Sequence, residues 1–257
     1  MKKFFSLFLA ISFVGLSPVF ADNNWIPTGS FSVTWQEKYL GAGIPENFHD
    51  DPMIWDCLRL NLPKDFFLET WHSYGLDDND FSSNYGDEVD LTIGWNKTVG
   101  NYMFLFSVGY WNLHPLENWN DKDVLAPIFS VSRNFAIAEN HSLSAGVQFD
   151  FIGAINDFDN GAIAILPSIT HRWEKVFQSD LISFSHTLGL MWMTGGEKMA
   201  ITEADDLTVK YSAGTDWNIS KNFFITAPGI IIMAPLTNDS GTRSFVTSFN
   251  FSVNFKF

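Results

Sequence analysis

Residues Ser244 to Phe257, which end the chain, read Ser-Phe-Val-Thr-Ser-Phe-Asn-Phe-Ser-Val-Asn-Phe-Lys-Phe. One parity of this stretch is apolar and mostly aromatic: Phe249, Phe251, Val253, Phe255 and Phe257. The other parity is polar: Ser248, Asn250, Ser252, Asn254 and Lys256. Because successive side chains of a β-strand point to opposite faces, the stretch predicts a strand with one aromatic and one polar face. Lipid contact would explain so aromatic a face, although the last strand of a soluble β-sandwich would also alternate.

The same alternation recurs along the whole chain. Phe31 to Trp35, Val89 to Trp95 and Leu143 to Phe151 each place apolar and polar residues on opposite parities. Counting such segments gives about twelve strands, an even number, as single-chain bacterial barrels require. We therefore predict an all-β fold for residues 22–257, a single transmembrane antiparallel up-and-down barrel, with a periplasmic β-sandwich as the competing class.

The connections between these segments alternate in length. The short ones are residues 62–65, 96–101, 133–140, 174–180 and 218–222. The long ones are residues 40–52, 74–87, 113–123, 154–161, 194–206 and 235–243. Short periplasmic turns and long extracellular loops are typical of outer-membrane barrels, whereas a soluble sandwich has no reason to sort its loops in this way.

Three segments follow the alternation less clearly. Phe66 to Ser73 has no clear parity, Val124 to Ser132 contains Pro127, and Phe223 to Met233 is apolar on both parities. We expect a strand in each, with the least certain boundaries in the second.

The first 21 residues have the pattern of a secretory signal peptide. Lys2 and Lys3 precede an apolar run from Phe4 to Leu16, and Val19-Phe20-Ala21 forms a small-residue cleavage site. The apolar run is shorter than the roughly 20 residues that a membrane-spanning helix needs. We therefore expect cleavage after Ala21 and export to the bacterial outer membrane.

The charge of the chain excludes some partners. The formal net charge is −14, and removing Lys2 and Lys3 with the leader makes it −16. So large an acid excess argues against nucleic acid or anionic lipid as a partner. The single cysteine, Cys57, excludes an internal disulfide. Instead, we expect outer-membrane lipids, lipopolysaccharide and the barrel-assembly machinery as partners.

Most of the acids fall in the long connections. These are Glu46, Asp50, Asp51, Asp77, Asp78, Asp80, Glu117, Asp121, Asp123, Asp157, Asp159, Glu197, Glu203, Asp205, Asp206 and Asp239. They indicate either solvated surface loops or a negative vestibule that concentrates cations and binds divalent ions. The stretch at residues 157–161 resembles the start of a calcium loop, but no glutamate follows at the required spacing. We expect no bound cofactor or resident metal.

Three motifs resemble those of the TorF-like porin family of small outer-membrane barrels. They are the first strand at residues 30–43, the Asp-Glu-Val-Asp-Leu-Thr-Ile-Gly-Trp run at 87–95 and the Trp-Asn-Ile-Ser-Lys-Asn turn at 217–222. The spacing of strands and connections resembles that of the family over most of residues 22–257, whereas the residues themselves match only in these motifs. It implies a passive pore and carries over no functional residues.

The polar parity of the strands supplies the candidate pore-lining residues. They are Arg59, Glu69, Glu88, Asp90, Asp150, Arg172, Lys210 and Asp216. Such charges would set the ion selectivity of an aqueous pore, here a passive channel for small hydrophilic solutes that favours cations. In a narrow barrel they would instead pair and fill the interior, which predicts a non-conducting structural or surface-interaction barrel.

Catalysis has weak support in the sequence. His72-Ser73, His141-Ser142 and Ser185-His186 are adjacent pairs, whose side chains point to opposite faces of a strand. They do not form a nucleophile and base in place, and neither Gly-x-Ser-x-Gly nor His-Glu-x-x-His occurs. An outer-membrane lipid-modifying hydrolase is therefore the least favoured function, and we expect no enzyme.

The terminal aromatic residue has a role of its own in this interpretation. Phe257 ends the closing strand, where a terminal aromatic resembles the signal that the insertion machinery reads. We therefore expect Phe257 to act as an insertion signal.

Overall fold

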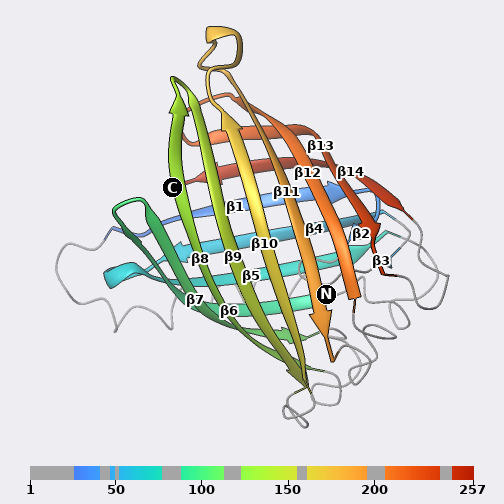
Figure 1. The fold of residues 1–257 in the computed structure, drawn as a ribbon. Coiled ribbons are helices and arrows are strands. Elements are labelled where there is room, and N and C mark those ends of the chain that lie inside the picture. Colours follow the sequence, from blue (N-terminus) through green and yellow to red (C-terminus); the bar gives the residue numbers. More distant parts are fainter. Residues whose placement is uncertain are drawn as a thin grey trace.

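The computed structural model describes residues 26–40, 47–49, 52–76, 88–112, 123–154, 161–195, 206–237 and 245–257. These residues form a closed β-barrel with tilted strands (Figure 1). The leader at 1–21, the stretch at 157–160 and all the acids of the long connections except Asp123 and Asp206 lie outside these ranges. No helix in the described ranges is both long and apolar enough to cross a membrane.

Twelve strands make up the barrel. They are β1 (Thr28–Gln36), β4 (Met53–Asn61), β5 (Phe66–Gly75), β6 (Glu88–Val99), β7 (Tyr102–Asn112), β8 (Val124–Ala138), β9 (His141–Ala154), β10 (Ala162–Trp173), β11 (Ile182–Thr194), β12 (Asp206–Asn218), β13 (Phe223–Pro235) and β14 (Val246–Lys256). Each pairs antiparallel with its neighbours in chain order, and β1 pairs with β14 to close the barrel. The predicted fold is thereby confirmed.

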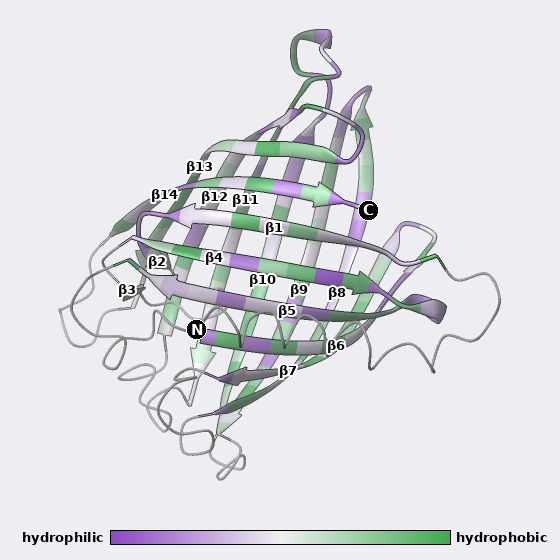
Figure 2. Cartoon of the chain, turned by 180° about the vertical axis from the view of Figure 1, so that it is seen from behind, coloured by the Kyte–Doolittle hydropathy of each residue, from purple (hydrophilic) through white to green (hydrophobic). Residues whose placement is uncertain are grey.

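The two faces of the wall differ as the sequence pattern predicts. In β1, Phe31, Val33 and Trp35 are 36–40% exposed, whereas Thr34 and Gln36 are at most 4% exposed. Apolar and polar bands accordingly alternate along the strands in Figure 2. The exposed parity is the outer face, and the polar parity faces the interior.

The short connections gather at one end of the barrel (Figure 1). They include the 3₁₀ turns η1 (Pro63–Asp65) and η3 (Val176–Gln178). At the other end, the first long connection contains a small hairpin, β2 (Tyr39–Leu40) with β3 (Asn47–His49), which the alternation pattern did not predict. This hairpin pairs outside the barrel sheet.

Two of the predicted turns are shorter than expected. β8 continues to Ala138, so the turn expected at 133–140 is reduced to Glu139 and Asn140, where Asn140 has φ +60°. Likewise, β6 continues to Val99. The polar residues that indicate a turn instead belong to strand ends; the guanidinium of Arg133, for example, lies 5.3 Å from the ring centre of Tyr102.

The structure of β13 accounts for the apolar residues on both parities of its sequence. The pairing with both neighbours shifts between Thr226 and Gly229, so the strand contains a bulge. Because a bulge inserts a residue, the outer-facing parity changes along the strand. Ile225 faces outward before the bulge and Ile230 after it, so both parities are apolar.

Candidate functional site

All eight predicted pore-lining residues occupy inner-face positions in the strand register. Arg59 and Glu69 pair across β4 and β5. Their Nη1 and Oε2 atoms lie 3.5 Å apart, and both side chains are about one-third exposed. Below the guanidinium, the Phe67 ring centre lies 3.7 Å from Arg59 Cζ. One of the predicted bases is thus paired with one of the predicted acids at this point.

A second ion pair near the short-turn end joins β10 to β12 along the inner face. Arg172 Nη1 lies 3.6 Å from Asp216 Oδ2, and Arg172 Nε lies 3.3 Å from Glu174 Oε1. Arg172 Nη2 also donates to Ser183 Oγ at 3.2 Å, and Asp216 accepts from Thr226 Oγ1 at 2.7 Å. This network holds both predicted side chains against the wall.

The remaining acids of the predicted set are more deeply buried. Asp150 is 1% exposed, and both of its carboxylate oxygens accept from Gln148 Nε2, at 2.9 and 3.1 Å. Glu88 and Asp90 occupy successive inner positions of β6, opposite Ser73 and Trp71 of β5. Asp90 Oδ1 is buried and has no hydrogen-bond partner. Glu88 and Asp90 thus form an acidic stretch of β6 next to Glu69 of β5, whereas Asp150 lies on β9.

Lys210 differs from the other two predicted cations because it has no ion-pair partner in the described ranges. It lines a cavity of about 410 Å³ inside the barrel, between β7 and β12. The lining includes the hydroxyl-bearing residues Ser130, Ser132, Ser144, Ser168, Thr170, Thr187 and Ser212, together with Gln148. Among the described residues of this lining, Lys210 is the only charged one, and those without a hydroxyl, amide or ammonium group are apolar or glycine.

Part of the hydroxyl lining is internally bonded and part is not. Thr170 Oγ1 and Thr187 Oγ1 share a hydrogen bond of 2.8 Å. Ser132 Oγ, in contrast, is buried without a partner. Because buried polar groups are normally hydrogen-bonded, an unpaired hydroxyl on a cavity wall is a position that water or a polar ligand would satisfy.

Apolar residues fill the interior on the long-loop side of this cavity. Leu40, from β2, packs with Met191 and Met233 in a cluster in which each residue is at most 4% exposed. Leu166 packs against this cluster, and both Leu166 and Met191 also line the cavity. The Lys38 carbonyl, two residues before Leu40, accepts from Ser248 Oγ at 3.0 Å. Leu40, at the start of the first long connection, therefore lies in the interior beside the cavity.

A second apolar cluster lies on the neighbouring inner wall. It consists of Val124, Ala126, Ile152, Ala162, Ala164 and Met193. Reasoning from the sequence considered only charged residues and so missed both clusters and the hydroxyl lining. The serines and threonines do fall on the polar parity and could have been recognised there. Leu40 could not, because its position depends on the fold of a loop.

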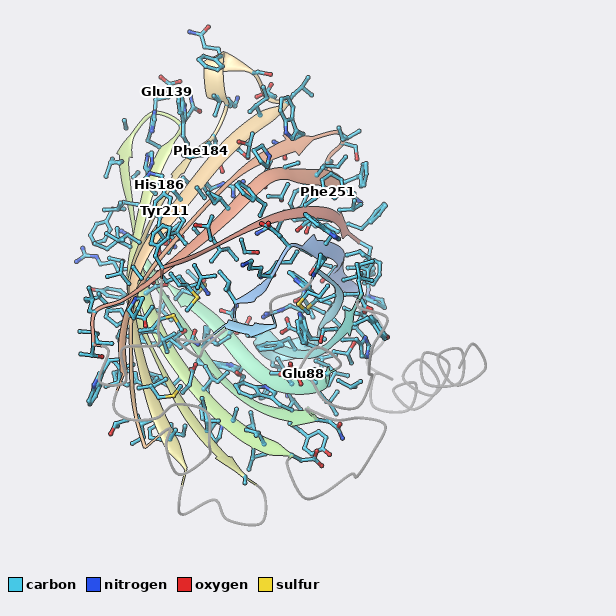
Figure 3. The ribbon with its side chains drawn as sticks, turned by 90° about the vertical axis from the view of Figure 1, so that its right-hand side faces the viewer. Glu88, Glu139, Phe184, His186, Tyr211 and Phe251 are labelled. Carbon is cyan, nitrogen blue, oxygen red and sulfur yellow. The ribbon has the colours of Figure 1, made fainter. Side chains whose placement is uncertain are left out.

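The outer face carries one group of polar side chains near the short-turn end. His141 Nδ1 lies 3.1 Å from His171 Nε2, and His171 Nδ1 lies 3.1 Å from His186 Nε2. We call these three residues the histidine ladder. Trp173 stacks on His141 with ring centres 5.3 Å apart, and Tyr211 lies 6.1 Å from His186. Figure 3 shows Phe184, His186 and Tyr211 together toward the end where Glu139 lies, with Glu88 toward the opposite end.

A second outer-face pair joins β4 and β5. Asp56 Oδ1 and His72 Nδ1 lie 2.9 Å apart, and both side chains are about 15% exposed. Asp56 shares the outward parity of Leu58, so an acid lies among the apolar residues of this face. The next residue after His72, Ser73, is on the inner face, so the two side chains lie on opposite sides of the wall. In the described ranges, no group of three or more His, Cys, Asp or Glu side chains is arranged to hold a metal ion.

Known proteins of similar architecture are found by structure and not by sequence. No protein-family model matches the sequence, and the comparison with curated proteins gives no match. The NanC porin superposes with a TM-score of 0.54 at 8% identity, covering 88% of this chain and 100% of that one. An outer-membrane channel from Pseudomonas putida F1 gives 0.51 at 10% identity, covering 92% and 98%. LpxR from Salmonella typhimurium gives 0.50 at 11% identity, covering 89% and 100%.

The chain has the fold of outer-membrane β-barrel proteins. At identities of 8 to 11%, these superpositions show the fold alone. The resemblance to the TorF-like porins stays a prediction, since it rests on short motifs.

Proposed function

We propose that this barrel is a passive outer-membrane channel for small hydrophilic solutes, exported by a cleaved leader at residues 1–21. The observation that carries the proposal is the cavity of about 410 Å³ on a polar inner face, within a wall whose outer face is apolar. A polar, water-accessible interior inside a lipid-facing barrel is the arrangement that porins use. In this function the channel narrows where Leu40 packs against Met191 and Met233.

The preference for cations is a finer part of the same proposal. Among the inner-face side chains that the structure describes, the acids are Glu69, Glu88, Asp90, Asp150 and Asp216, and the bases are Arg59, Arg172, Lys210 and Lys256. Five acids against four bases give only one excess negative charge. The larger contribution comes from the acids of the long connections, because a mouth of one charge sign concentrates ions of the other sign.

A non-conducting structural or surface-interaction barrel is the second candidate. The observation that favours it is the pairing of Arg59 with Glu69 and of Arg172 with Asp216, together with the apolar clusters on the long-loop side. Paired charges and packed side chains are how narrow barrels fill their interior. Lys210, unpaired beside a cavity, is the residue that this candidate leaves unexplained.

Planar-bilayer conductance of the purified, folded protein separates the two candidates. We expect discrete conductance steps and, under a salt gradient, a reversal potential whose sign shows cation preference. Heat-denatured protein is the control and should give no steps. A folded protein without any steps would contradict the channel, whereas steps with an anion-selective reversal potential would contradict only the cation preference.

A further inference from the structure

We propose that the cavity around Lys210 is a binding site for a small hydroxylated carboxylate, such as a sugar acid. The proposal rests on the channel function and deepens it by naming the class of solute that the interior retains. It starts from Lys210, a predicted pore-lining cation that lies on the cavity and has no ion-pair partner in the described ranges.

An unpaired ammonium group inside a protein favours an anionic ligand. Moving a charge out of water is costly unless an opposite charge or several hydrogen bonds compensate for it. Arg59 and Arg172 find such compensation in the wall, at Glu69 and Asp216. Lys210 has neither acid within ion-pair distance, and its strand neighbours on the inner face are Gly189 and Met233. A carboxylate in the cavity would supply the missing charge.

The remainder of the lining fits the hydroxyl groups of the same ligand. Seven serine and threonine side chains and Gln148 surround the space, and each hydroxyl can both donate and accept. Ser132 Oγ is already buried without a partner, so a ligand hydroxyl there gains a hydrogen bond that the wall does not supply. Met103, Leu166 and Met191 offer apolar contacts for the carbon face of a sugar ring.

The size and position of the cavity also suit a retained solute. Its volume of about 410 Å³ lies in the range of ligand pockets, roughly 300–1,000 Å³. Leu166 and Met191 belong both to its lining and to the cluster around Leu40. A solute held by Lys210 therefore sits next to the apolar cluster around Leu40, which occupies the interior beside the cavity.

Isothermal titration calorimetry of the full-length folded protein in detergent tests the proposal, with glucuronate and glucose as probes. The two sugars share a ring and differ in a carboxylate, so we expect glucuronate to bind and glucose to bind about tenfold or more weakly, as a charge-assisted hydrogen bond implies. Equal affinity for the two sugars would overturn the proposal, and so would a failure of glucuronate to bind. This comparison needs no variant and therefore does not depend on how substitutions fold.

Two variants locate the binding. Lys210→Gln should weaken glucuronate about tenfold or more and leave glucose little changed. Lys256→Gln is the matched control, because Lys256 also occupies an inner-face position but lies over the Phe224 ring, at 5.1 Å, and not on the cavity. Ser168→Leu, which fills the cavity without changing charge, should abolish binding. Unchanged glucuronate affinity in Lys210→Gln would contradict the site, as would an equal loss in Lys256→Gln.

Binding and conductance test the proposed site and the proposed channel separately. Glucuronate binding by a protein that gives no conductance would refute the channel and keep the site. Conductance without glucuronate binding would refute the site and keep the channel.

Discussion

Gly94 in β6 shows how single residues shape the interior. A Cβ atom at this position would lie 2.4 Å from the Phe67 ring and 2.7 Å from Ser107 Cβ. Phe67 is 2% exposed and lies under the Arg59 guanidinium, so the glycine makes room for the ring that supports the Arg59–Glu69 pair.

We therefore expect Gly94→Val to destabilise the barrel by about 1–3 kcal/mol, the usual cost of overpacking. The measurement is urea unfolding of the protein in lipid vesicles, followed by tryptophan fluorescence. Combining Gly94→Val with Phe67→Ala should recover part of the loss, since the ring is what the new side chain meets. If the double variant is as unstable as the sum of the single variants, the clash with Phe67 is not the cause.

The histidine ladder gives a second prediction at this scale. His171→Phe keeps a ring but removes both hydrogen bonds, which should cost about 1–3 kcal/mol at 0.5–1.5 kcal/mol for each bond. His141→Phe removes only one of them and should cost about half as much. The same unfolding assay measures both free-energy losses. Equal losses in the two variants would show that the two hydrogen bonds do not contribute separately to stability.

At the scale of residues, the sequence predicted which face of the wall a side chain lies on but not which side chains contact each other. Alternation placed all eight charged candidates on the inner face, because a strand leaves each side chain only two directions. Which of them would pair was not accessible, since Arg172 meets Asp216 through the register of three strands. The histidine ladder also depends on register, because its two hydrogen-bonded pairs join residues that are 30 and 15 positions apart in sequence.

At the scale of elements, the closing pair β1 and β14 determines whether the barrel has free edges. Seven residue pairs join the two strands, from Ser30 with Lys256 to Gln36 with Asn250. Beyond them, Gly29 and Phe257 exchange two backbone hydrogen bonds, of 2.8 and 3.1 Å. Closure removes strand edges that lipid cannot satisfy.

Deleting Phe257 removes these two backbone hydrogen bonds and a ring that lies against Gly29. The ring accounts for at most about 1.5–3 kcal/mol of burial, and it is 48% exposed, so the loss alone should not unfold the barrel. We nevertheless expect a large loss of protein from the outer membrane, because we expect the terminal aromatic to act as an insertion signal. Membrane fractionation of expressing cells measures this.

Phe257→Trp is the matched control for the deletion. It keeps a terminal aromatic residue and should assemble nearly as well as the unchanged protein. Normal outer-membrane yield of the truncated protein would contradict the insertion signal.

Element boundaries could be predicted where both neighbours of a strand are regular. β13 was ambiguous because its bulge changes the outer parity within the strand, and Trp217 Nε1 bonds the Ala227 carbonyl at 2.7 Å beside it. β8 was predicted too short because polar residues at a strand end and in a turn have the same composition. Pro127 does not interrupt β8, since the pairing with β9 omits Ala126 and Pro127.

At the scale of the whole molecule, a residue from outside the barrel strands occupies part of the interior. Leu40 is 3% exposed and packs in one cluster with Met191 and Met233. In the channel function, we expect Leu40→Ala to raise the single-channel conductance measurably, because it removes an apolar side chain from the interior. Leu236→Ala is the control, since Leu236 is 58% exposed near the end of β13. Unchanged conductance in Leu40→Ala would show that ions pass elsewhere.

The unequal strand lengths imply a bilayer of unequal thickness around the molecule. β1 and β4 have nine residues each, whereas β8 has fifteen. At about 3.3 Å per residue and a tilt of about 40°, the shorter strands rise roughly 23 Å and β8 roughly 38 Å. Acyl chains shorten or tilt beside a wall that is shorter than the hydrocarbon core of the bilayer. We therefore expect a thinner bilayer beside β1 and β4, at the closing seam, than beside β8.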